Sequence, residues 1–187
     1  MDRKTMDRKT QGYIFFTLYI ACIPLANYLI GHVGAFCVPD GPCMIPVWPG
    51  IAAPSGVLAI GAALVLRDLV QRRLGLAFSL AAIVIGAVIS WFISPPFLVL
   101  ASVLAFVFSE TADALVFTPL QKRGLLVAVA VSAAAGILVD SVLFLHFAFH
   151  SQEFLAGQII GKLWAVLASM PIIQLIRRAD ARAGIAS

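Results

Sequence analysis

The chain has 187 residues, of which 61% are hydrophobic and only 12% are charged, and its mean hydropathy is +1.01. A soluble protein carries about 25% charged residues, so the composition excludes an ordinary soluble domain. The length suits one membrane domain and leaves no room for a separate soluble catalytic domain. The net charge of +4 would also fit a nucleic-acid-binding protein, but the positions of the basic residues argue against that class.

The sequence predicts an all-α integral membrane protein with six transmembrane helices. A spanning helix needs about 20 apolar residues. The second apolar segment is short and interrupted by Pro and Gly, which favours a broken or tilted helix. We expect a disordered cytoplasmic tail over residues 1–10, where MDRKT occurs twice, a membrane domain over 11–178, and a second cytoplasmic tail over 179–187. The apolar segments lie at 12–31, 51–66, 74–94, 97–120, 124–149 and 154–176.

The first connection is rich in Pro and Gly and contains Cys37 and Cys43. In a bacterial inner membrane this connection would face an oxidising compartment, where disulfides can form. We favour two free thiols, and a disulfide between them stays open. No strand alternation is evident along the chain.

The basic residues alternate between connections. Twelve of the thirteen lysines and arginines lie at one set of connections, and the thirteenth is Lys162, inside the sixth segment. Because basic residues stay on the cytoplasmic side, both termini are predicted to be cytoplasmic. These twelve basic residues therefore act as topology determinants rather than as a nucleic-acid-binding surface. They lie in residues 3–9, 67–73, 122–123 and 177–182.

Polar side chains inside the apolar segments fall into two layers. At a rise of about 1.5 Å per residue, Asp140 and Lys162 lie at the same depth on helices five and six. Glu110 and Asp113 lie deeper, near the cytoplasmic end of helix two. The outer layer contains Asn27, Asp140, Gln158 and Lys162, and the inner layer contains Arg67, Asp68, Glu110 and Asp113.

A charge at mid-bilayer costs about 2.5–3.5 kcal/mol on insertion scales, so these groups require partners or a substrate. Asp140 and Lys162 are expected to form a pair. Glu110 and Asp113 share a helix face and would repel each other unless a cation, a proton or a donor intervenes, and Arg67 is the nearest candidate by depth. Structural ion pairs that only fix helix packing remain an alternative for both layers.

Small residues form ridges on two helices. One ridge runs along helix six at Gly157, Gly161, Ala165 and Ser169, and another runs along helix five. Such ridges allow close helix contact in lipid. We favour packing within the chain, which would point Gln158 and Lys162 inward, over a homodimer contact. His146 and His150 have metal-compatible spacing, but we interpret them as interfacial residues, and we expect neither a metal nor a cofactor.

Four stretches of the sequence resemble the VUT (vitamin uptake transporter) family of queuosine-precursor transporters. They are RDLVQRRLG, ASVLAFVFSETADALVF, VDSVLFLHFAF and GQIIGKLWAVLASMP, at 67–75, 101–117, 139–149 and 157–171. The resemblance implies a six-helix inner-membrane protein similar to the substrate-binding components of energy-coupling-factor transporters. The implied substrates are 7-cyano-7-deazaguanine, 7-aminomethyl-7-deazaguanine and queuine. All residues of the inner layer, together with Asp140 and Lys162, match the family's polar positions.

A carboxylate can accept both the ring N–H and the exocyclic amino group of a deazaguanine. We expect Glu110 to do this, with Asn27, Gln158 or Lys162 donating to the carbonyl edge. The predicted function is therefore import of a small purine-like substrate. One alternative is a binding subunit that needs a separate ATPase. The other is an intramembrane enzyme, which the absence of GxSG, HExxH and paired-aspartate protease patterns argues against.

Overall fold

The computed structural model describes residues 3–39, 41–182 and 184. Most of these residues are helical, and three short strands lie between the first two helices. The long helices are α1 (Arg3–His32), α2 (Val57–Leu74), α3 (Leu76–Ile93), α4 (Val99–Leu120), α5 (Leu125–Phe149) and α6 (Leu155–Arg182), with a 3-10 turn, η1 (Pro96–Leu98), before α4. The strands are β1 (Phe36–Cys37), β2 (Cys43–Trp48) and β3 (Ile51–Pro54).

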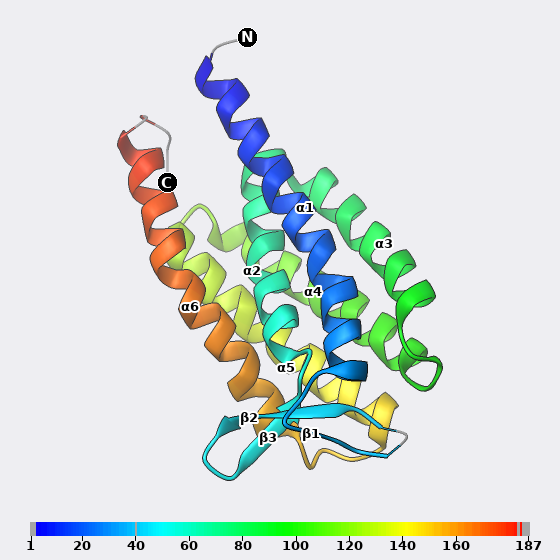
Figure 1. Cartoon of the computed structure of the whole chain (residues 1–187). Helices are drawn as coiled ribbons and strands as arrows, with labels where there is room; N and C mark the ends of the chain where they lie inside the picture. Colours follow the sequence, from blue (N-terminus) through cyan, green and yellow to red (C-terminus); the bar gives the residue numbers. More distant parts are fainter. Residues whose placement is uncertain (1–2, 40, 183, 185–187) are drawn as a thin grey trace.

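The helices run alternately up and down in one bundle (Figure 1). The start of α1 and the end of α6 lie at the same end of the bundle, and the small sheet lies at the opposite end. Helix α2 is central, because it contacts all five other long helices. The helix at the centre of the bundle therefore carries four charged residues within its 18 positions: Arg67, Asp68, Arg72 and Arg73.

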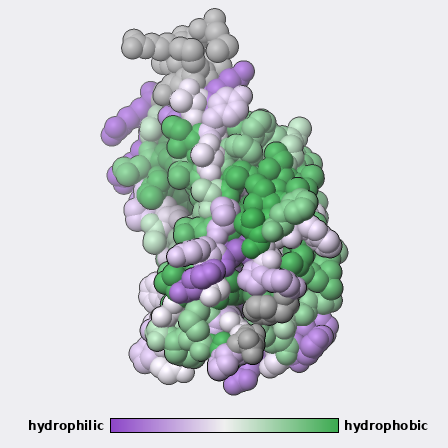
Figure 2. All heavy atoms as spheres, turned by 45° about the vertical axis from the view of Figure 1, so that its right-hand side comes forward, coloured by the Kyte–Doolittle hydropathy of each residue, from purple (hydrophilic) through white to green (hydrophobic). Residues whose placement is uncertain are grey.

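Five of the described helices are long and apolar enough to cross a membrane: α1, α3, α4, α5 and α6. Helix α2 differs from them because its 18 residues include two arginines near its end and the adjacent pair Arg67–Asp68. Figure 2 shows hydrophobic side chains over much of one face, with hydrophilic ones near its ends and a further hydrophilic group between the hydrophobic areas in its lower half. Large apolar residues such as Phe92 and Leu115 are 80% and 71% exposed. Such a surface is suited to lipid rather than to water.

The predicted tails are shorter than expected. Residues 3–10 were predicted to be disordered, but α1 begins at Arg3, since Lys and Arg are good helix formers and extend the helix from its apolar part. At the other end α6 continues to Arg182, beyond the predicted boundary at 178. Residues 1–2, 183 and 185–187 lie outside the described residues.

The second predicted segment is wrong in its boundaries. Residues 51–54 form β3, and the helix begins at Val57 and continues to Leu74. Arg67 is consequently a buried helical residue rather than part of a connection. The prediction ended too early because five of the eight residues at 67–74 are polar. In the bundle these polar side chains find partners on other helices, so the helix continues.

The absence of strands was also a wrong prediction. Strands β1, β2 and β3 form an antiparallel sheet, in which Gly50 adopts φ = 75° in the two-residue turn between β2 and β3. Glycine adopts this conformation without a steric penalty. Cys37 and Cys43 are paired residues of β1 and β2 and form a disulfide, in contrast to the free thiols that we favoured. Their pairing in register, which the sequence did not reveal, holds the two cysteines together.

The ridge on α6 packs within the chain, as predicted. A Cβ on Gly157 would meet the Ala52 backbone oxygen, and one on Gly161 would meet Val57. Helix α2 approaches the same ridge closely, because a Cβ on Gly61 would lie 2.6 Å from the Lys162 backbone oxygen. This close contact turns Gln158 and Lys162 into the bundle, where they are 2% and 1% exposed.

Candidate functional site: a cavity beside two buried ionic layers

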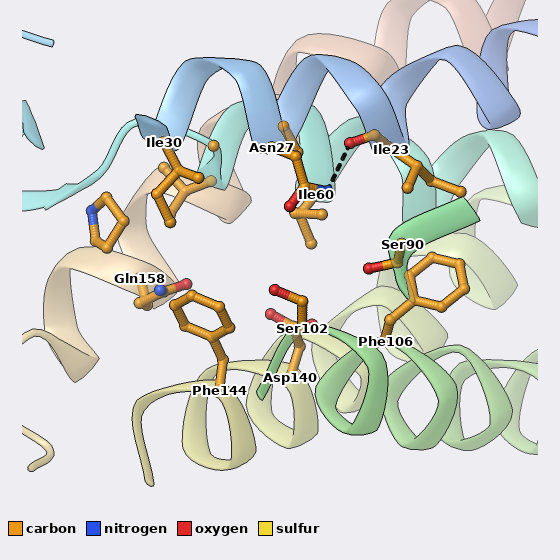
Figure 3. A pocket seen from close by; sticks show the side chains of 14 residues that line it. Ile23, Asn27, Ile30, Ile60, Ser90, Ser102, Phe106, Asp140, Phe144 and Gln158 are labelled. Carbon is orange, nitrogen blue, oxygen red and sulfur yellow. Dashed lines mark hydrogen bonds between the residues drawn. The ribbon is translucent and has the colours of Figure 1, made fainter. Parts of the chain in front are cut away.

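A cavity of about 60 Å³ lies inside the bundle, between α1, α2 and the helices that follow (Figure 3). Its wall is mainly apolar, with a few polar side chains that point inward, which is typical of a small-molecule site. Phe106 and Phe144 present aromatic rings to it from α4 and α5. The full lining is Ile23, Ala26, Asn27, Ile30, Pro54, Gly56, Val57, Ile60, Ser90, Ser102, Phe106, Asp140, Phe144 and Gln158.

Three of the four predicted outer-layer residues line this cavity: Asn27, Asp140 and Gln158. Asn27 donates its amide to the Ile23 backbone oxygen at 3.0 Å, which leaves its side-chain oxygen free of that bond. The Gln158 side chain is buried, yet its Oε1 accepts no hydrogen bond from the described residues. In Figure 3 the amide of Gln158 points toward the cavity. An unpaired buried acceptor is costly, so this oxygen marks a place for a donor.

The fourth outer-layer residue, Lys162, lies behind the cavity wall. Its Nζ donates to Asp140 Oδ2 at 2.6 Å and to Ser141 Oγ at 2.9 Å. The predicted pairing of Asp140 with Lys162 is thereby confirmed. The other carboxylate oxygen, Asp140 Oδ1, accepts a weak bond of 3.4 Å from Ser109. Asp140 therefore has one oxygen fully engaged and one that can still accept.

The inner layer forms a second buried group deeper in the bundle. Arg67 donates to Asp68 Oδ1 at 2.8 Å, and its Nε lies 3.5 Å from Glu110 Oε2 and 3.7 Å from Asp113 Oδ2. All four side chains are at most 2% exposed. The guanidinium also donates to Gln71 at 3.0 Å. The four residues lie together, as the depth prediction expected. Arg67 is the cation that pairs with the three carboxylates.

The four inner-layer residues do not line the cavity. Glu110 was predicted to contact the substrate, but it lies one helical turn beyond the cavity residue Phe106 and faces Arg67. The structure thus brings Asn27, Asp140 and Gln158 together at one cavity and separates them from the inner layer. The two groups are nevertheless neighbours, because Glu110 directly follows Ser109, whose Oγ lies 3.4 Å from Asp140 Oδ1.

Several contributors were not predicted. The hydroxyls of Ser90 and Ser102 and the rings of Phe106 and Phe144 line the cavity. Their sequence signal is weak, since serine and phenylalanine are common in membrane helices. Depth arithmetic like that used for the charges would have placed Phe144 one helical turn from Asp140.

A further ionic contact closes the end of the bundle where the chain begins and finishes. Asp180 pairs with Arg72 at 3.1 Å and with Arg73 at 2.9 Å, which joins the end of α2 to the end of α6. The prediction placed Asp180 in a tail and so missed it. These two arginines nevertheless lie at the end of the bundle where the alternation of basic residues located them.

The apolar helices are those of a multi-pass membrane protein, and a cavity lies among them. Residues 77–176, more than half of the chain, match the family described as "Putative vitamin uptake transporter". The chain belongs to this family, and the match supports a transporter rather than an enzyme. Comparison with curated proteins and with solved structures finds no match.

Proposed function

We propose that the protein imports queuosine precursors, namely 7-cyano-7-deazaguanine, 7-aminomethyl-7-deazaguanine or queuine, across a bacterial inner membrane. The observation that carries this proposal is the cavity, where the unpaired Oε1 of Gln158 and the weakly bonded Oδ1 of Asp140 lie close to two aromatic rings. A deazaguanine offers adjacent N–H donors on one edge and a flat π system for the rings. The resemblance in sequence supplies the substrate class, and the cavity supplies the chemistry that suits it.

We assign the purine edge to Asp140 rather than to Glu110, because Asp140 lines the cavity and Glu110 does not. Asp140 Oδ1 can accept from the ring N–H or the exocyclic amine, and Gln158 Oε1 can accept from the other. The Asn27 side chain lies across the cavity from Asp140 (Figure 3). Lys162 pairs with Asp140 Oδ2 and orients this carboxylate from behind the cavity wall. The inner layer, which we also predicted to bind substrate, does not line the cavity and adjoins it where Glu110 follows Ser109, the neighbour of Asp140.

Replacing Gln158 tests the site. Gln158→Met preserves the side-chain length but removes the unpaired acceptor. We expect affinity for 7-cyano-7-deazaguanine to fall by about 1–3 kcal/mol, roughly 5- to 150-fold in Kd. Binding to purified, monodisperse protein by calorimetry provides the measurement. Gln152→Met, at an exposed position, is the matched control and should bind like wild type. Unchanged affinity in Gln158→Met would remove Gln158 from the site.

We further propose six spans with both termini in the cytoplasm. Helix α2 is the sixth span, since it runs the length of the bundle between α1 and α6 (Figure 1). The basic residues, including Arg72 and Arg73, cluster at the end of the bundle where α1 starts and α6 ends. That distribution supports a cytoplasmic location for this end.

Single cysteines at opposite ends of the bundle test this orientation. In a Cys22→Ser background the native disulfide leaves no other described cysteine free. We expect Ala181→Cys to resist an impermeant thiol reagent in intact cells and Ser151→Cys to react. Both positions are exposed, so accessibility in permeabilised cells controls for local reactivity. The reverse pattern would contradict cytoplasmic termini.

Transport by the protein alone distinguishes import from the two alternatives. Purified protein in liposomes should take up labelled 7-cyano-7-deazaguanine without an ATPase complex. Substrate binding without uptake would favour a binding subunit that needs a partner. Chemical conversion of the substrate would favour an intramembrane enzyme.

A homodimer remains a separate proposal, for which the mass of the protein in native nanodiscs is the measurement.

A further inference from the structure

The inner layer has an imbalance of charge. Three carboxylates, on Asp68, Glu110 and Asp113, face the single guanidinium of Arg67. If all three were ionised, two negative charges would lie uncompensated in the low-dielectric centre of the bundle. Burying one unpaired charge already costs several kcal/mol. A neutralising species is therefore required.

The hydrogen bonds show where that species would bind. Asp113 is 0% exposed, and neither of its carboxylate oxygens accepts a hydrogen bond from a described residue. The nearby Ser132 hydroxyl has one proton, which it donates to Asp68 Oδ2 at 2.7 Å. Glu110 Oε2 also lacks a hydrogen bond and has only the ion pair with Arg67. Three buried carboxylate oxygens thus lack a donor.

Asp68 and Asp113 both lie within 4 Å of the Arg67 guanidinium, at 2.8 and 3.7 Å, so the two carboxyl groups are neighbours. Two carboxyl groups held side by side do not both ionise readily, and the usual solution is to share one proton. A protonated carboxyl would donate its O–H to a neighbouring carboxylate oxygen. It would thereby satisfy one of the unpaired acceptors and remove one excess charge.

A metal ion fits the inner layer less well than a proton. The Arg67 guanidinium is already within 4 Å of both Glu110 and Asp113, and it would repel a second cation. No cluster of three His, Cys, Asp or Glu side chains suited to a metal occurs among the described residues. A proton needs only one oxygen lone pair and no coordination shell.

The remaining ionisable neighbours come from other helices. Tyr19 and Cys22 are buried on α1, Asp140 on α5 contacts Ser109, the residue before Glu110, and Lys162 on α6 pairs with Asp140. The only titratable group among them that belongs to the cavity is Asp140. A proton that arrives in the inner layer therefore changes the electrostatic field at the carboxylate of the cavity.

We propose that the inner layer is a proton-binding site and that its protonation drives import through its effect on the neighbouring Asp140. The coupling step rests on the proposed function. One proton forms an O–H bond with a carboxylate of the layer from the external side and is released unchanged into the cytoplasm. Protonation removes negative charge next to Asp140 and favours the inward passage of the occupied cavity.

Infrared spectroscopy tests the site without any substrate. In wild-type protein in nanodiscs, titration from acid to alkaline pH should show the C=O band of a protonated, buried carboxyl group that persists above the range where exposed carboxyls ionise. The band should be lost or shifted in Asp113→Asn and Glu110→Gln and retained in Glu153→Gln, whose carboxylate is exposed. Absence of such a band in wild type would overturn the proposal. Because this measurement uses the wild-type protein, it does not depend on whether the variants fold.

Proteoliposomes test the coupling. With an acidic exterior, a gradient of one pH unit should support about tenfold accumulation of labelled 7-cyano-7-deazaguanine at one proton per substrate. Accumulation driven by a sodium gradient and indifferent to pH would overturn proton coupling. If the purine is not transported but the infrared band titrates as described, the proton site stands and only the proposed substrate fails.

Discussion

Asp140→Asn is expected to destabilise the protein by about 3–5 kcal/mol, because it leaves the Lys162 ammonium buried without its charged partner. Lys162 is 1% exposed, and its 2.6 Å bond to Asp140 is its shortest contact. The remaining bond to Ser141 is neutral and cannot compensate a full charge. The measurement is thermal unfolding of the purified protein in detergent, together with the yield of monodisperse protein.

The double variant decides whether the two residues interact. Adding Lys162→Gln to Asp140→Asn removes the uncompensated charge and should restore part of the lost stability. Two neutral amides can still form a hydrogen bond between α5 and α6. Losses that simply add in the double variant would show that the pair is not coupled. Glu153→Gln, which neutralises an exposed carboxylate on the adjacent connection, should leave stability unchanged.

Arg67→Gln should have an even larger effect on folding. Arg67 is completely buried and is the one described cation within 4 Å of three carboxylates. Without it, the inner layer retains only negative charge, and we expect a loss of at least about 3–5 kcal/mol. Arg67→Lys should recover little, because a single ammonium cannot reproduce the donors that reach Asp68, Gln71 and the Glu110 backbone oxygen.

Rescue and control variants make this prediction specific. Adding Asp113→Asn to Arg67→Gln removes one of the stranded carboxylates and should restore part of the folded yield. Arg182→Gln also removes an arginine, but at an exposed site, and should behave like wild type. The measurement is the fraction of protein that elutes as a monodisperse peak and its unfolding temperature. A stable Arg67→Gln protein would show that the carboxylates are neutral without Arg67.

The sequence predicted the polar interior well because helix geometry is regular. A constant rise per residue was enough to place Asp140 beside Lys162 and Arg67 beside Glu110, although each pair is distant in sequence. The same arithmetic placed Glu110 in the inner layer but could not show whether its side chain faces the cavity or Arg67. That choice depends on how the helices rotate about their axes, which is set by close contacts such as the one between Gly61 and α6.

The region between α1 and α2 was predicted least well. Its sheet depends on pairing between short strands, and the register that brings Cys37 opposite Cys43 is not encoded in local periodicity. The extension of α2 to Leu74 was missed for a related reason. Arg72 and Arg73 read as a connection in the sequence, but their partner Asp180 is more than a hundred residues away.

The composition of α2 has a consequence for the biogenesis of the protein. Arg67 and Asp68 would each cost about 2.5–3.5 kcal/mol on insertion scales at the centre of a bilayer. Within α2 they have each other and Gln71, whereas Glu110 and Asp113 belong to α4, which is synthesised about forty residues later. A nascent chain that ends after α2 therefore holds a segment that the lipid phase disfavours. We expect stable integration of α2 to await the emergence of α4, so that the translocation machinery must handle these helices as a group rather than releasing them one by one.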